Sequence, residues 1–90
     1  HPQLSQELIE ALVAKQVSLI GIDMAGGRRG AEHAAADEFC ADHSTYIIEN
    51  LVNMKQVYAN SHKPFTVHTY PLNLSGYTGI PCRVIAEFDI

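Results

Sequence analysis

Three side chains in the middle of the sequence have the types that bind divalent cations: His33, Asp37 and Glu49. His33 and Asp37 are four positions apart in the alanine-rich stretch 31–42, so a helix there would place both on one face. Glu49 follows three β-favouring residues, 46–48, and stands where a strand is expected to end. One imidazole and two carboxylates suit zinc or manganese. The three residues are therefore a candidate metal site.

The helical pair also has a second interpretation, a solvated helix face, and spacing alone favours it. A histidine and an aspartate one helical turn apart form a local hydrogen bond on many solvated helix faces, so the pair is common by chance. The other histidines match no metal-ligand spacing, and His68 is expected to be a half-exposed strand residue. They are spread along the chain: His1, His43, His62 and His68.

The elements that must position these side chains follow from periodicity. Residues 4–16 predict a helix with Ser5 as its N-cap, because apolar residues recur there at helical spacing. The recurring residues are Leu4, Leu8, Ile9 and Leu12. Residues 17–23, VSLIGID, predict a strand buried on both faces, and residues 46–48 predict a second buried strand. A helix followed by a buried strand is typical of the α/β class.

A glycine-rich, positively charged loop, MAGGRRG at residues 24–30, comes directly after the first strand. Ligands tend to bind at the carboxyl ends of strands in open α/β sheets, which raises the question of phosphate binding. The loop, however, fits neither the Walker spacing nor GxGxxG. We therefore favour a turn in which Arg28 and Arg29 are solvated or face a substrate carboxylate.

The second half of the chain predicts a short helix and two strands. Residues 50–57 form the expected helical turn. Residues 64–74, PFTVHTYPLNL, alternate as a strand that Pro71 ends or bulges. The turn cluster at 75–81 then leads to a closing strand at 82–88, where apolar and polar residues again alternate.

Composition and charge exclude several classes of protein. The 90 residues suit a single domain spanning residues 1–90, and no apolar run is long enough for a membrane helix. A net charge of −4 argues against a nucleic-acid partner. Cys40 and Cys82 match no metal-binding spacing, and one pair is too few for a disulfide scaffold. We therefore expect reduced thiols and a cytoplasmic location.

Three short motifs in a fixed order carry a family resemblance: GID at 21–23, ENL at 49–51 and PLNLSGYTGIPCR at 71–83. In this order they resemble the C-terminal half of the putative cyclase family, which includes kynurenine formamidase and isatin hydrolase. The resemblance covers essentially the whole chain. It implies an α/β fold, the C-terminal half of a swivelling β/β/α domain, with a mixed sheet and two short helices.

The resemblance also implies a metal-dependent hydrolase that acts on an N-formyl or cyclic amide. In the family the glutamate of ENL binds the metal, which corresponds to Glu49 here. A second family ligand, a histidine, lies twelve positions earlier, where this sequence has Asp37. Either Asp37 serves as that ligand or His33, one turn back, replaces it. The unbroken offset favours Asp37, with His33 beside or outside the site.

The family motif H-x-G-T-H-x-D-x-P-x-H, which supplies the remaining ligands and the presumed general base, does not occur in this sequence. We therefore expect the chain to be the C-terminal part of such a hydrolase and to be inactive by itself. Its expected partners are a small-molecule amide substrate, zinc or manganese, and either the N-terminal half or further copies of the chain. The alternative is a small non-catalytic module for metal binding, ligand binding or oligomerisation.

Overall fold

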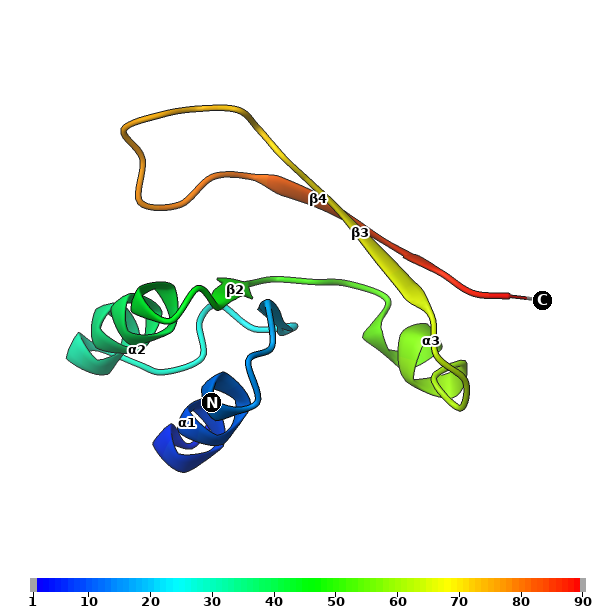
Figure 1. Ribbon diagram of the computed structural model, residues 1–90, viewed down its shortest axis with the longest axis horizontal. Coiled ribbons are helices and arrows are strands. Elements are labelled where there is room, and N and C mark those ends of the chain that lie inside the picture. Colours follow the sequence, from blue (N-terminus) through cyan, green and yellow to red (C-terminus); the bar gives the residue numbers. More distant parts are fainter. Residues whose placement is uncertain (1, 90) are drawn as a thin grey trace. The chain divides into compact units, whose positions relative to one another are not determined.

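The structure is a computed structural model, and it describes residues 2–89. Within these residues the elements follow in the order α1, β1, α2, β2, α3, β3, β4 (Figure 1). The chain consists of two compact units, His1–Val52 and Asn53–Ile90. Helices and paired strands occur in both units, so the predicted α/β class is confirmed. The single domain expected over residues 1–90 stays a prediction.

The first unit begins with α1 (Gln6–Ala14), which Ser5 caps as the sequence predicts. The Leu8 backbone N–H donates a hydrogen bond to Ser5 Oγ at 3.1 Å, so one otherwise free N–H of the first turn is satisfied. Ile9 and Val13 bury their side chains, whereas Leu8 is exposed. The buried face of α1 therefore includes Ile9 and Val13, whereas the sequence predicted a buried face that also includes Leu8.

Two short strands form the sheet of the first unit, β1 (Leu19–Gly21) and β2 (Tyr46–Ile48). They pair in parallel with Ile20 opposite Ile47. Parallel neighbours require a crossover, and α2 (Ala31–Asp42) provides it. The mixed character expected of the sheet is present as this parallel pair together with an antiparallel pair in the second unit.

The core of the first unit lies between α1, α2 and one face of the β1–β2 pair. Its buried side chains come from all three places: Ile9, Val13, Ile20, Ile22, Ala36 and Cys40. On the other face, Leu19 is 40% exposed and Tyr46 is 57% exposed. The prediction that these strands are fully buried is therefore wrong within this unit, because the two helices cover only one side of the pair.

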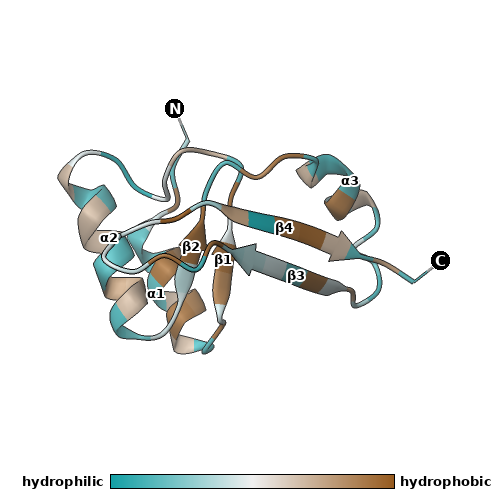
Figure 2. Ribbon diagram, turned by 90° about the horizontal axis from the view of Figure 1, so that it is seen from above, coloured by the Kyte–Doolittle hydropathy of each residue, from teal (hydrophilic) through white to brown (hydrophobic). Residues whose placement is uncertain are grey.

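The second unit contains α3 (Met54–Ala59) and an antiparallel hairpin of β3 (Thr66–Pro71) and β4 (Cys82–Glu87). Pro71 ends β3, and half-buried residues alternate with exposed ones along β4, as the sequence predicts. None of the residues 53–89 is buried. Figure 2 shows hydrophobic residues on strands of both units. Over residues 2–89, every helix falls short of the length and apolar character that crossing a membrane requires.

Candidate metal centre

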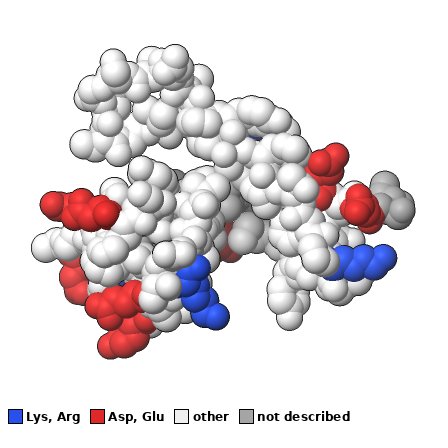
Figure 3. Space-filling model, in the orientation of Figure 1, with Lys and Arg blue, Asp and Glu red and all other residues white. Residues whose placement is uncertain are grey.

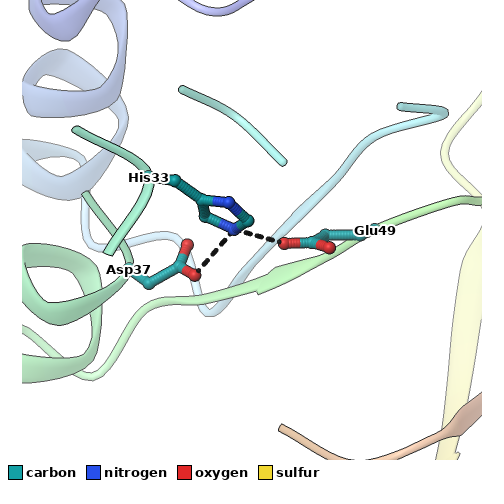
Figure 4. Close-up of side chains that lie close together, drawn as sticks. All are labelled: His33, Asp37 and Glu49. Carbon is teal, nitrogen blue, oxygen red and sulfur yellow. Dashed lines mark hydrogen bonds and ion pairs between the residues drawn. The ribbon is translucent and has the colours of Figure 1, made fainter. Parts of the chain in front are cut away.

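Three side chains from two elements converge at the carboxyl end of β2 (Figure 4). His33 and Asp37 project from α2, and Glu49 directly follows the strand. His33 Nε2 lies 3.0 Å from Glu49 Oε1 and 3.2 Å from Asp37 Oδ2. One ligand atom of each residue lies within 4.8 Å of the other two. The structure therefore brings together all three residues that the sequence singled out.

Backbone hydrogen bonds on both sides of Glu49 hold the end of β2 in place. The Ile22 N–H donates to the Ile48 carbonyl at 2.9 Å, and the Asn50 N–H donates to the Met24 carbonyl at 3.1 Å. Asn50 has φ 58°, in the left-handed region that asparagine tolerates better than most residues. The chain thus turns immediately after Glu49, and the carboxylate stays beside α2.

The glycine-rich loop after β1 is attached to the chain through Arg28. Its Nη1 donates to the Leu4 carbonyl at 2.7 Å, and its guanidinium pairs with Glu32. In return, the Leu4 N–H donates to the Gly27 carbonyl at 2.7 Å. The prediction that Arg28 is solvated or faces a substrate is therefore wrong, because the side chain is used to hold the loop. Arg29 is exposed, as expected.

Asp37 is the member of the cluster whose charge the surroundings disfavour. Burial raises the pKa of the Asp37 carboxyl, His33 acts to lower it, and the nearby Glu49 raises it again, with a net upward shift. The side chain is 45% exposed, yet Oδ1 is buried and has no hydrogen-bond partner among the described residues. A buried acceptor without a partner is costly, whereas the oxygen of Asp37 that faces His33 is Oδ2.

The spacing of the donors also fits a cation. An ion bound at about 2.0–2.2 Å holds neighbouring donors roughly 3.0–3.5 Å apart. The two separations from His33 Nε2, 3.0 and 3.2 Å, fall in this range, which is also that of a hydrogen bond. His33 and Glu49 remain 37% and 30% exposed, so the cluster is open on one side. A catalytic metal site requires such an open position.

The charge around the cluster favours cations over anions. Acidic side chains gather over α1 and α2 (Figure 3). The exposed ones are Glu7, Glu10, Glu32, Glu38 and Asp42. They outnumber the exposed basic side chains of the same unit, Lys15 and Arg29, and a mainly acidic surface raises the local concentration of cations.

Sequence reasoning placed His33 beside or outside the site, and the structure puts it in contact with both carboxylates. It also missed a second pair, His68 Nε2 and Glu87 Oε1, which lie 3.0 Å apart on the hairpin. The alternating sequence pattern predicted the strands that carry these two residues, but only the register of the hairpin brings their side chains together. Within residues 2–89, His68 and His43 join no group of three metal-binding side chains.

No protein-family model matches the chain, and neither a curated protein nor a solved structure matches it. The fold and the site define an α/β chain with a candidate centre for a divalent cation. The resemblance to the cyclase family stays a prediction drawn from the order of its three motifs.

Proposed function

We propose that His33, Asp37 and Glu49 bind a divalent cation, zinc or manganese, and that the chain is the C-terminal part of a metal-dependent amide hydrolase. One observation carries the proposal: a nitrogen and two carboxylate oxygens, drawn from α2 and the end of β2, lie within 4.8 Å of one another. The reaction class, cleavage of an N-formyl or cyclic amide, rests on the resemblance to the cyclase family.

A divalent ion bound here would supply Lewis acidity toward an amide carbonyl. The residues of the chain have separate tasks. His33 offers a nitrogen donor between two carboxylates, and the negative charges of Asp37 and Glu49 compensate a divalent cation. The open side of the cluster leaves space for the small-molecule amide substrate.

A hydrolytic site needs more than these three side chains, because a general base must also be positioned. Among the residues that the structure describes, no other group of three metal-binding side chains is present. We therefore propose that another segment, carrying the family motif, supplies the base and further ligands. The partner is the N-terminal half of such an enzyme or a further copy of the chain. The free thiols Cys40 and Cys82 support a reducing, cytoplasmic location.

A non-catalytic association module is the second candidate function, and the second unit favours it. Large apolar side chains of this unit are exposed: Tyr58, Val67, Tyr70, Leu72, Leu74, Tyr77, Ile80 and Ile85. Large apolar side chains that stay exposed are available to bind another protein. Metal binding by the chain distinguishes the two candidates, since an association module has no need of the cluster.

Elemental analysis after dialysis against zinc or manganese tests the proposal. We expect the wild-type chain to retain metal and Glu49→Gln to bind it more than about tenfold more weakly, because an amide is a poor substitute for a charged ligand. Glu38→Gln is the matched control, since Glu38 is an exposed carboxylate on α2 outside the cluster. Equal metal content in wild type and Glu49→Gln would contradict the proposal.

A further inference from the structure

We propose that Gly26 is a positioning residue of the metal centre. The His33 imidazole packs against the backbone of Gly26, and this contact keeps Nε2 directed at Asp37 and Glu49. The inference rests on the proposed function, because it gives Gly26 the task of orienting a metal ligand.

The contact between Gly26 and His33 is tighter than a residue with a side chain normally allows. A Cβ built on Gly26 would lie 3.0 Å from His33 Cε1, 3.1 Å from Nε2 and 3.2 Å from Nδ1. Gly26 is buried and has φ +124°, which residues with a side chain rarely adopt. A Cβ at this position would require the ring, and Nε2 with it, to shift by a few tenths of an ångström.

The backbone segment that contains Gly26 is hydrogen-bonded on both sides of this residue. The Leu4 N–H donates to the Gly27 carbonyl at 2.7 Å, and the Asn50 N–H donates to the Met24 carbonyl at 3.1 Å. Asn50 directly follows Glu49 in the chain. One backbone segment therefore supports the imidazole and also holds the strand end that carries a carboxylate.

The orientation of a metal-binding histidine depends on the contacts of its whole ring. A metal-binding histidine commonly donates its other ring N–H to a carboxylate or carbonyl, which fixes the orientation of the ring. The contacts of His33 with Asp37 and Glu49 both use Nε2, and no residue of the described range hydrogen-bonds Nδ1. Gly26 lies against the face of the ring, beside Cε1 and both ring nitrogens, so contact with it limits how far the ring can tilt.

The test is the zinc affinity of the Gly26→Ala chain, measured by titration calorimetry on protein whose fold is checked by circular dichroism. We expect a loss of about tenfold or more, the range typical of residues that orient metal ligands. Two glycines of the same loop serve as controls. A Cβ on Gly27 would make ordinary contacts, the nearest at 3.6 Å, whereas Gly30 has φ +57° and open space around it. Gly27→Ala controls for added bulk and Gly30→Ala for backbone strain, so both should keep an affinity close to wild type.

A double-mutant cycle shows whether Gly26 acts through His33. In the His33→Ala background, adding Gly26→Ala should not weaken the remaining affinity further, because the ring that it displaces is absent. The imidazole 15N resonances give a second readout. Zinc should shift the His33 Nε2 signal in the wild type, and this shift should be reduced in folded Gly26→Ala.

The outcomes separate the inference from the proposed function. Zinc binding by wild type and an equal affinity in Gly26→Ala overturn the inference alone. Equal losses in Gly26→Ala and Gly30→Ala also overturn it, because they assign the effect to strain. No zinc binding by the wild type overturns the proposed function and the inference together. If Gly26→Ala does not fold, nuclear Overhauser contacts between the Gly26 Hα protons and the His33 ring of zinc-bound wild type decide, and their absence refutes the inference.

Discussion

At the residue scale, the candidate centre assembles charges that the metal-free protein tolerates poorly. Oxygens of Asp37 and Glu49 lie within 4.8 Å of each other, and His33 is the only described basic group in contact with both. Burial and the charge of Glu49 raise the pKa of the Asp37 carboxyl against the opposing effect of His33. Sites kept for function commonly cost stability in this way.

We therefore expect Asp37→Asn to stabilise the metal-free protein at neutral pH while weakening metal binding. The amide removes a charge that the surroundings disfavour, but the gain stays below about 1 kcal/mol, because the side chain is nearly half exposed and screened by solvent. Urea denaturation without metal and calorimetric titration with zinc measure the two effects. The control is Asp42→Asn, on the exposed end of α2. A less stable metal-free variant would contradict the electrostatic account.

The stability gained by Asp37→Asn should also depend on pH. Because the folded pKa of Asp37 lies above its ordinary value of 3.8, the folded wild type binds more protons than the unfolded chain between these two pKa values. The contribution of Asp37 is therefore most favourable below the ordinary value and is lost as pH rises through the folded pKa. The free energy of unfolding of Asp37→Asn relative to wild type should rise across this window. A difference that stays constant from about pH 3 to pH 6 would show that the shift is absent.

At the element scale, Thr45 joins the two elements that carry the metal-binding side chains. It is fully buried, and its Oγ1 donates to the Val17 carbonyl at 2.7 Å. Its N–H donates to the Cys40 carbonyl near the end of α2 at 2.9 Å. These two hydrogen bonds therefore connect the start of β2 to α2 and to the segment that precedes β1.

Thr45→Val tests how much the hydrogen bond from Thr45 Oγ1 contributes to stability. Valine keeps the shape of threonine but removes the donor, so the Val17 carbonyl loses its partner in a partly buried position. We expect a loss of about 1–3 kcal/mol in the free energy of unfolding, measured by urea denaturation. Thr66→Val is the control, because Thr66 is exposed on β3. A change as small as that of the control would mean that the hydrogen bond contributes little.

At the scale of the whole molecule, the two units differ in how much they bury. The buried core residues lie in His1–Val52, whereas residues 53–89 include none. An isolated antiparallel hairpin is only marginally stable in water. We therefore expect the hairpin of β3 and β4 to depend on a partner, which agrees with the proposal that the chain works together with another segment.

The 90-residue chain should not hydrolyse amides by itself. Three donors can hold an ion, but the base and further ligands implied by the family resemblance are not among these residues. The chain, loaded with zinc or manganese, is assayed with N-formylkynurenine and isatin. A chain that also carries the H-x-G-T-H-x-D-x-P-x-H motif is the positive control. Turnover by the 90-residue chain at the rate of this control would show that the catalytic site lies wholly within it.

Local features of the fold were open to prediction, because neighbouring residues encode them. The capping of α1 by Ser5 follows from the side-chain oxygen at the start of an apolar period. The shared face of His33 and Asp37 follows from the helical repeat. The end of β3 at Pro71 follows from the missing N–H. Each of these depends on residues within about one helical turn, so the sequence by itself determined them.

Only the tertiary structure decided which of these local features meet. The approach of Glu49 to His33 depends on how α2 packs against the end of β2, and no local pattern encodes that packing. The sequence also could not predict that Tyr46 is exposed or that Gly26 contacts the His33 ring. Burial and close approach are set by the packing of segments distant in sequence. The residue types of the candidate centre could therefore be read from the sequence, whereas its geometry came from the packing of α2 against β2.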